Sequence, residues 1–290
     1  MPDMCATYRV RSCGFYMRLL LMLMPVGLFS QTSPPPPPFR PPSPPPVPVD
    51  HNKTTRPHMG STLTDECARW MNGTLGTFHN NDRKGIRFNM RGFTSQYGQD
   101  RTLWDRLFKN STGPEFYYAD VAANHYKHLS NTYFFDRCLG WSGVCVEPNP
   151  VYWAELRSKR SCHVVPHCVS NTTDEVNFRM GDNKFGVFGS IEGSGPFVNL
   201  WKESRPIERL RCIRTQSAFD EVHDMSHVHL MSLDVEGHEA AVLDGIDFGR
   251  MRIDAILCES GCTRVLPRLG YVKTKHIIKD EWLWEKGDTL

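Results

Sequence analysis

The chain has 290 residues, with 34 Lys and Arg against 32 Asp and Glu, so its formal net charge is only +2. This balance, without a long basic run, argues against a nucleic-acid partner. Proline fills most of residues 34–48, "PPPPPFRPPSPPPVP", and such a run cannot form a helix or an inner strand. We expect an extended spacer there, followed by a body at 59–290 that is long enough for one large core.

The N-terminal piece has a basic flank before the apolar stretch 19–29, "LLLMLMPVGLF". A flank followed by about 7–15 apolar residues is typical of a signal peptide. The stretch is short for a full membrane span of about 20 residues, and the large residues Leu28 and Phe29 make a poor cleavage site. Three alternatives stay open for residues 1–30: a cleaved signal peptide, a short signal-anchor of a type II membrane protein, or a disordered cytosolic N-terminus. Residues 31–58 form the expected Pro-rich stem.

Two further features favour the secretory pathway. N-glycosylation sequons begin at Asn52, Asn72, Asn110 and Asn171. The chain has ten cysteines, of which eight fall in the body, and this is many for a reducing compartment. Because no two of them form a CxxC pair, structural zinc is not expected.

The body alternates expected strands with expected helices. Strands are predicted at 115–122, 142–149, 162–170, 228–237 and 252–260, and a closing antiparallel hairpin at 270–278 and 281–286. Helices are predicted at 95–108 (with Ser95 as N-cap), 129–140, 150–160, 216–225 and 238–246. The Gly-rich residues 189–196 predict a mobile loop. This alternation indicates a doubly wound, mostly parallel α/β sheet.

Four of the predicted strands end in an acid, namely Asp120, Glu147, Asp234 and Glu259. In parallel α/β sheets, ligands bind beyond the carboxyl ends of the strands. A single acid at such a place is commonly a turn residue or a helix cap, but four at one edge indicate a functional edge.

The spacing of the first two acids narrows the choice of ligand class. Glu147 follows Asp120 by one helix and one strand, and an acid about 20 residues after the first turn commonly binds ribose hydroxyls. The turn at 122–126, "AANHY", lacks the GxGxxG that admits a pyrophosphate. A nucleoside without pyrophosphate is therefore expected, and S-adenosylmethionine is the common one.

Several sequence blocks resemble one enzyme family. Residues 119–150, "ADVAANHYKHLSNTYFFDRCLGWSGVCVEPNP", and 232–248, "SLDVEGHEAAVLDGIDF", are similar to the FkbM-type methyltransferases, as is "SQYGQD" at 95–100. The resemblance covers about residues 95–290, which leaves 59–94 as an N-terminal extension. It implies a class I methyltransferase (Rossmann-like) fold, S-adenosylmethionine as donor and usually a hydroxyl oxygen as acceptor.

The resemblance also implies a donor site. Its members would be Asp120, Ala122 and Asn124 at the methionine end, Glu147 at the ribose, and Pro148, Asn149, Val169 and Ser170 beside the adenine. The family has glycines where this chain has Ala122 and Tyr126, so either the first loop is displaced or the tyrosine ring covers the donor. In the family's sheet order a disulfide between Cys138 and Cys162 is expected at the opposite edge.

The segment 234–239, "DVEGHE", carries the expected chemistry. Methyl transfer to a hydroxyl needs alignment of the acceptor and removal of a proton. His238 could be the base, with Asp234 and Glu236 beside it as catalytic candidates. Alternatively, Glu236 and Glu239 could cap the N-terminus of the following helix, where acids are favoured. Alternatively, Asp234 and Glu259 could hold Mg²⁺, which would lower the pKa of the hydroxyl.

Three functions are compatible with these observations. The first is an O-methyltransferase of a glycan or a small hydroxylated acceptor, located at the Golgi membrane or secreted. The second is a catalytically weak or inactive methyltransferase-fold binding module whose altered first turn no longer holds the donor. The third is a wall-associated structural protein, because the Ser-Pro runs resemble extensin-like segments in composition; the acid-ended strands argue against this one.

Overall fold

The structure is a computed structural model. It describes residues 61–72, 77–81, 87–91, 93–181, 189–194, 206–223, 225–258, 260–278 and 281–287. The predicted signal segment and the Pro-rich stem lie outside these residues. None of the helices in the described ranges combines the length and the apolar character that a membrane span requires.

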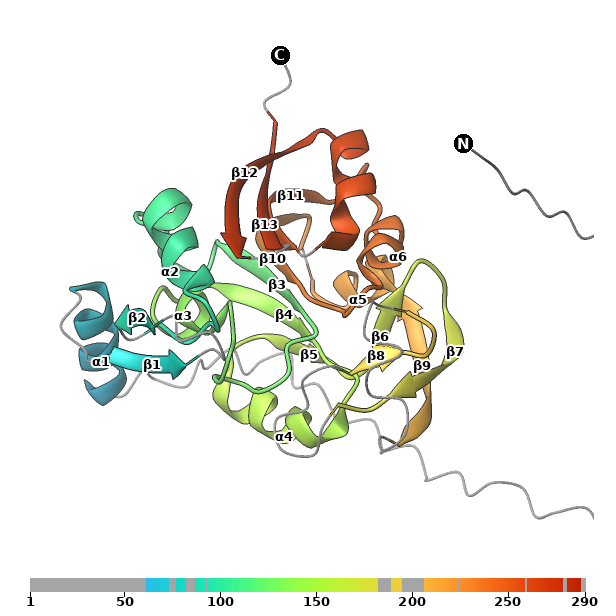
Figure 1. The fold of residues 1–290 in the computed structure, drawn as a ribbon, viewed down its shortest axis with the longest axis horizontal. Coiled ribbons are helices and arrows are strands. Elements are labelled where there is room, and N and C mark those ends of the chain that lie inside the picture. The colour runs from blue at the N-terminus through green and yellow to red at the C-terminus, as the bar shows by residue number, and fades with distance from the viewer. Residues whose placement is uncertain are drawn as a thin grey trace, which may run out of the picture. The chain divides into compact units, whose positions relative to one another are not determined.

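A large mixed sheet organises the body (Figure 1). Its strand order is β12-β13-β11-β10-β3-β4-β5. The strands are β3 (Tyr117–Val121), β4 (Ser142–Val146), β5 (His163–Val165), β10 (His227–Leu233), β11 (Arg252–Cys258), β12 (Tyr271–Ile278) and β13 (Glu281–Lys286). Strands β3, β4, β5, β10 and β11 run parallel, and β13 pairs antiparallel with both β11 and β12. The mostly parallel sheet with a closing hairpin is thus confirmed.

Helices cover both faces of this sheet. One face packs in an aromatic cluster against α2 (Gln99–Leu103), the π-helix η1 (Trp104–Phe108), α3 (Tyr133–Arg137) and α4 (Pro150–Lys159). The other face packs against α5 (Thr215–Phe219), α6 (Glu239–Asp244) and the 3-10 helices η2 (Ser260–Arg264) and η3 (Leu266–Leu269). Central strands are buried on both faces, which explains their nearly continuous apolar sequences.

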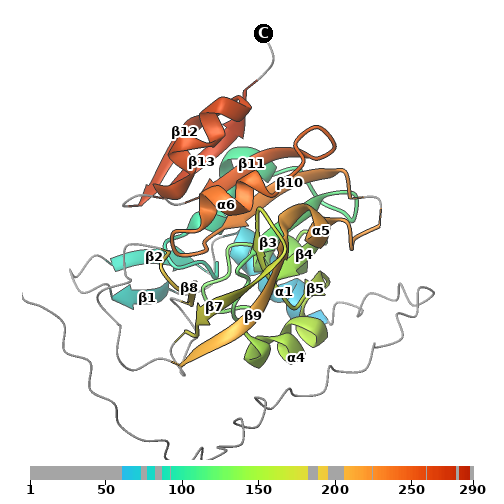
Figure 2. The same cartoon turned by 90° about the vertical axis from the view of Figure 1, so that its right-hand side faces the viewer.

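A second sheet differs from the sequence prediction. The predicted strand 162–170 is split into β5 and β6 (Cys168–Ser170) at Pro166, which has no N–H to continue the ladder. The second sheet has the order β6-β9-β7-β8 and consists of β6, β7 (Asp174–Arg179), β8 (Ser190–Ile191) and β9 (Ile207–Arg214). Figures 1 and 2 show it beside the β3–β5 part of the large sheet. Strand β8 also occupies part of the predicted mobile loop, whose last two residues lie outside the described ranges.

Three predicted helices are shorter than expected. The helix predicted from Ser95 begins at Gln99, because Gly98 is the N-cap with φ of 79°. The Ser95 hydroxyl accepts the Asp100 N–H at 3.3 Å from outside the helix, while the Asp100 carboxylate accepts the Ser95 N–H at 3.1 Å. The helix predicted at 129–140 is reduced to α3, since Leu129 has a left-handed φ of 61°. The helix predicted at 216–225 is reduced to α5.

The N-terminal extension is attached to the body. Helix α1 (Ser61–Met71) carries Cys67, which forms a disulfide with Cys138 on the C-terminal side of α3. Trp70 is only 3% exposed and packs against Tyr133 with ring centroids 6.2 Å apart. A two-stranded sheet of β1 (Thr77–Asn81) and β2 (Arg87–Arg91) follows.

The predicted disulfide Cys138–Cys162 is wrong. Cys138 is instead bonded to Cys67 of α1, and α1 lies outside the sequence blocks that carried the resemblance. Cys162 pairs instead with Cys145 on the neighbouring strand β4, where the Cα atoms are 5.7 Å apart, the usual spacing for a disulfide. The remaining four body cysteines form Cys168–Cys212 between β6 and β9 and Cys258–Cys262 after β11. All eight body cysteines are therefore paired.

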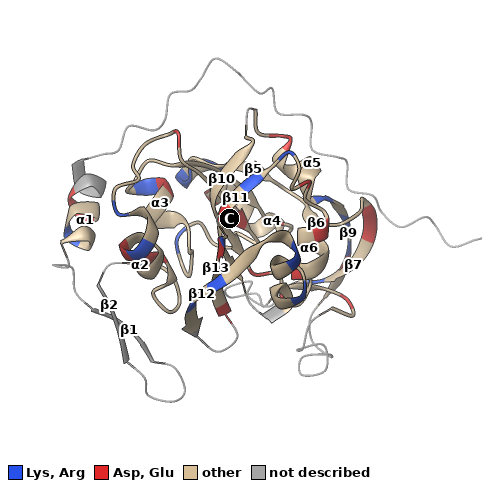
Figure 3. Cartoon of the chain, turned by 90° about the horizontal axis from the view of Figure 1, so that it is seen from above, with Lys and Arg blue, Asp and Glu red and all other residues tan. Residues whose placement is uncertain are grey.

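Charged residues of both signs are interspersed along the described ribbon (Figure 3). This agrees with the small net charge of +2.

Candidate functional site

Three acid-bearing strand ends meet at one edge of the large sheet. Val121 of β3 lies opposite Val146 of β4 and opposite Leu233 of β10, so the three strands end level. Asp120 is the penultimate residue of β3, while Glu147 and Asp234 directly follow β4 and β10. The sequence prediction placed these three correctly. Glu259 lies outside the described residues.

The first turn after β3 is unusual in its backbone. Ala122 and Asn124 have φ of 67° and 53°, in the left-handed region that costs an L-residue roughly 1–2 kcal/mol. The N–H groups of Ala122 and Ala123 both donate to the Val146 carbonyl at 3.0 Å, and these bonds fix the turn against the end of β4. The positive φ explains why a glycine would suit position 122.

Tyr126 does not cover this edge. Its ring packs beside His125, with centroids 4.5 Å apart, and the Lys159 ammonium lies 4.1 Å from the ring centroid. It also belongs to the rim of the aromatic cluster around Tyr133. Of the two alternatives left by the sequence, the ring covering the donor site is thus not what the structure adopts.

Glu147 joins the first turn to the start of α4. Its Oε2 accepts the Asn124 N–H and its Oε1 accepts the Asn149 N–H, both at 2.7 Å. The side chain is buried, and burial raises the pKa of Glu147 to about 7, although the two backbone donors act in the opposite direction. Asn149 in turn caps α4 by accepting the Val151 N–H at 3.1 Å.

A small cavity of about 40 Å³ lies at this edge. It brings together four of the predicted site residues, which are Ala122, Pro148, Val169 and His238. Phe178 and Ile191 of the second sheet form its other wall. Its volume is far below the roughly 300–1,000 Å³ of small-molecule sites, so a ligand of nucleoside size requires β7 and β8 to move outward or must lie across the open edge.

His238 is half-buried at the start of α6. Its Nε2 lies 2.9 Å from the Ser170 hydroxyl, which connects the start of α6 to the end of β6. Burial lowers the pKa of His238, while the nearby Glu239 carboxylate acts in the opposite direction. The imidazole is therefore neutral at pH 7 and can accept a proton. Asp234 is exposed and Glu236 has a left-handed φ of 53°, and neither lines the cavity.

Glu239 stabilises the loop that presents His238. Its Oε1 accepts the Gly237 N–H at 2.9 Å, and its Oε2 is buried without a hydrogen-bond partner. A Cβ at Gly261 would lie 2.2 Å from this Oε2, so a larger residue there would displace the Glu239 carboxylate. The sequence analysis treated Glu239 only as a helix-capping acid and did not single out Gly261.

Arg160 was missed by the sequence analysis. Its guanidinium is fully buried beneath the first turn and donates to Asp136 Oδ2 and to Thr132 Oγ1, both at 2.6 Å. Thr132 donates onward to Asp120, whose carboxylate lies 3.7 Å from Arg160. Burial raises the pKa of Asp120, and the Arg160 charge opposes that shift. An arginine at the end of a basic helix, "RSKR", gives no sequence signal for such a buried position.

The described residues contain one group of His, Cys, Asp or Glu side chains close enough to share a metal, and it consists of His227, His229 and Asp254. These residues lie at the amino ends of β10 and β11, away from Asp234. The predicted Mg²⁺ site at Asp234 and Glu259 thus gains no support from the described residues.

Comparison with known proteins identifies the family. Residues 120–277 match the family model described as the methyltransferase FkbM domain. The chain belongs to the FkbM methyltransferase domain family. A crystal structure of methyltransferase FkbM from Methylobacillus flagellatus KT matches this FkbM-domain chain with 13% sequence identity and a TM-score of 0.39, over 66% of this chain and 49% of that one. The chain thus spans about half the length of that structure's chain. None of the curated proteins matches it.

Proposed function

We propose that this FkbM-domain protein is an S-adenosylmethionine-dependent O-methyltransferase whose acceptor is a sugar hydroxyl of a glycan in the secretory pathway. The observation that carries the proposal is the family match over residues 120–277, which includes all three described acidic strand ends. The sheet, the first turn and the disulfides support its separate parts.

The sheet order supports a class I methyltransferase arrangement. Strands β3, β4 and β5 extend to one side, and β10 and β11 extend to the other. The order therefore reverses between β3 and β10, and ligands of such sheets bind at that switch point beyond the carboxyl ends. The first turn and the loop after β10 both lie there, as a donor site requires.

The residues at this edge fit a nucleoside donor by their chemistry. Each Glu147 oxygen has accepted one backbone N–H and has a second lone pair for a ribose hydroxyl. Pro148 and Val169 offer apolar surface for an adenine beside the Ala122 turn. The second sheet then acts as the movable wall of the site.

His238 is proposed as the general base. When bound, S-adenosylmethionine would supply an electrophilic methyl group and would leave as the neutral thioether S-adenosylhomocysteine. The neutral His238 imidazole would take the proton of the acceptor hydroxyl and would release it to solvent after transfer. Ser170 orients the ring through its hydroxyl at 2.9 Å. Asp234 and Glu236 are proposed to lie on the acceptor side, where an exposed carboxylate can bind sugar hydroxyls.

The secretory location rests on the cysteines and the sequons. The four disulfides favour an oxidising compartment, because disulfides form and persist there and are rare in the reducing cytosol. The sequon residues Asn72, Asn110 and Asn171 are all exposed, as glycosylation requires. The hydroxyls available in that compartment are mostly those of sugars.

A binding module without catalysis is the second candidate. The left-handed Ala122 and the cavity of about 40 Å³ favour it, because both reduce the affinity for a donor. Incubation of the oxidised protein with methyl-labelled S-adenosylmethionine and glycan acceptors separates the two functions. Label transferred to a glycan, and lost in His238→Ala, supports the enzyme; donor binding without transfer to any hydroxylated acceptor contradicts it.

A further inference from the structure

A second cavity lies at the amino ends of β10 and β11, at the edge of the sheet opposite the first turn. Its volume is about 940 Å³, within the range of roughly 300–1,000 Å³ that is usual for small-molecule sites. Its wall includes Asp254, Arg250, Tyr271, Glu285 and Lys286. The proposed methyl transfer uses none of these residues.

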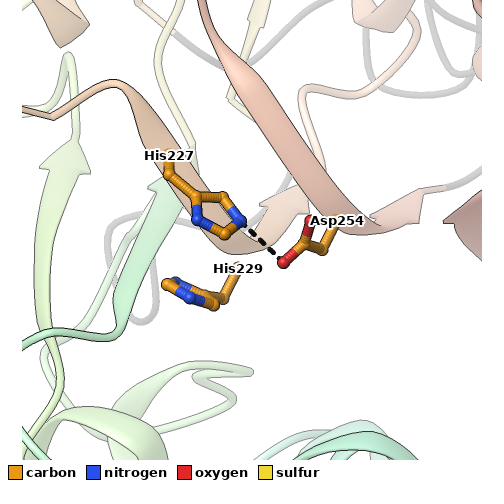
Figure 4. A group of neighbouring side chains, drawn as sticks. All are labelled: His227, His229 and Asp254. Carbon is orange, nitrogen blue, oxygen red and sulfur yellow. Dashed lines mark hydrogen bonds and ion pairs between the residues drawn. The ribbon is translucent and has the colours of Figure 1, made fainter.

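The cluster of His227, His229 and Asp254 beside this cavity does not suit a bound metal ion (Figure 4). His227 Nε2 lies 2.7 Å from Asp254 Oδ2, and the His227 and His229 rings are 4.1 Å apart. However, His229 Nδ1 accepts the Tyr117 N–H at 3.1 Å, so the proton of the neutral ring is assigned to Nε2. A metal-binding histidine instead donates from its second nitrogen to an acceptor. His229 therefore lacks a lone pair for a metal.

The cavity has cations that can take an anionic group. Lys286 has no ion-pair partner among the described residues; its Nζ donates to the Leu269 carbonyl and lies 4.9 Å from the centroid of the Tyr271 ring. Arg250 Nη2 donates a hydrogen bond to Asp220 Oδ1 at 3.0 Å, and the guanidinium has five N–H donors in all. A carboxylate of a ligand would find charge-assisted donors on both side chains.

The cavity wall also has a hydrogen-bond acceptor that an uncharged donor, such as a hydroxyl, could satisfy. Glu285 Oε1 is buried without a hydrogen-bond partner, and the Arg106 Nη2 is 3.9 Å away, too far for a hydrogen bond. Leaving such an oxygen unsatisfied is costly, and a ligand hydroxyl would satisfy it once the partly exposed Glu285 side chain turns toward the cavity that it lines. Tyr271 and Phe248, with ring centroids 6.2 Å apart, add apolar wall for the C–H face of a ring.

We propose that this cavity is a second ligand site, for an acidic sugar such as a uronic acid. The carboxylate is bound by Lys286 and Arg250, and a ring hydroxyl donates to Glu285. An anion without hydroxyls leaves Glu285 unsatisfied, and a neutral sugar leaves the cations unused. The site is remote from the first turn, so it holds a glycan without methylating the bound residue and does not depend on methyl transfer.

Isothermal titration of the full oxidised chain with D-glucuronate tests the proposal, without any methyl donor present. We expect saturable binding of one glucuronate, with roughly tenfold or more weaker binding of D-glucose and of acetate. Lys286→Met and Arg250→Gln should each weaken glucuronate binding by a similar factor, while Lys159→Met, an exposed lysine on α4, should not. Near-ultraviolet circular dichroism checks that each variant is folded.

Three results would overturn the site. They are no glucuronate binding at tens of millimolar, equal binding of glucose and glucuronate, and unchanged glucuronate binding in both folded cavity variants. Because donor binding at the first turn is measured separately, a failure here leaves the proposed methyl transfer untouched.

Discussion

Replacing Arg160 by methionine should destabilise the body by about 3–5 kcal/mol, the cost of leaving buried acids without their cation. The guanidinium is fully buried, 2.6 Å from Asp136 and 3.7 Å from Asp120. Because total stability is roughly 5–15 kcal/mol, this loss is a large share of it, and the variant should unfold at a markedly lower urea concentration. Urea unfolding of the oxidised chain, followed by tryptophan fluorescence, measures the difference. The matched control is Arg157→Met, an exposed arginine on the same helix.

The pH dependence of that loss follows from Asp120. Burial already raises the pKa of Asp120 while Arg160 lowers it, so removing Arg160 raises the pKa further. A buried acid with a raised folded-state pKa stabilises the folded protein below its unfolded-state pKa, and that stability is lost as the pH rises through the folded-state pKa. The difference in unfolding free energy between the variant and the wild type should therefore widen toward pH 8 and narrow toward about pH 4. If Arg160→Met unfolds within about 1 kcal/mol of Arg157→Met at pH 8, the network does not stabilise the first turn as argued.

Three further outcomes follow from the donor site and the disulfides. Glu147→Ala should weaken S-adenosylmethionine binding at least about tenfold, since a carboxylate contributes roughly 1.5–3 kcal/mol per hydrogen bond; unchanged affinity in a folded variant would exclude Glu147 as the ribose ligand. Because the pKa of Glu147 is about 7, wild-type donor affinity should fall below that pH, and calorimetry of Glu147→Gln should show no such dependence. Non-reducing peptide mapping should find Cys145 linked to Cys162 and Cys67 linked to Cys138, and Cys138 linked to Cys162 would contradict the fold at α1.

The sequence predicted the parts of the fold that depend on local pattern. Buried strands such as β3 and β4 follow from their apolar runs, and the acids after them follow from the strand ends. What escaped prediction depends on contacts between distant segments. Arg160 looks like an exposed helix end, and its burial follows only when α4 packs under the first turn. Cys67 lies 71 residues from its partner, in a segment outside the recognisable blocks.

Interruptions of regular structure were also hard to predict. Pro166 divides one apolar run between two sheets, which period-two alternation alone does not reveal. The left-handed residues Ala122 and Leu129 shorten or bend segments whose composition is ordinary. Ala122 lies at the candidate site, where tertiary contacts hold its backbone in a costly conformation.

Calorimetric titration of the oxidised chain with S-adenosylmethionine decides whether this protein binds a methyl donor. We expect saturable binding of one donor molecule per chain, weakened by Glu147→Ala and unaffected by Lys286→Met at the opposite edge of the sheet. Absence of donor binding by the folded, fully disulfide-bonded protein would contradict the proposed methyltransferase activity.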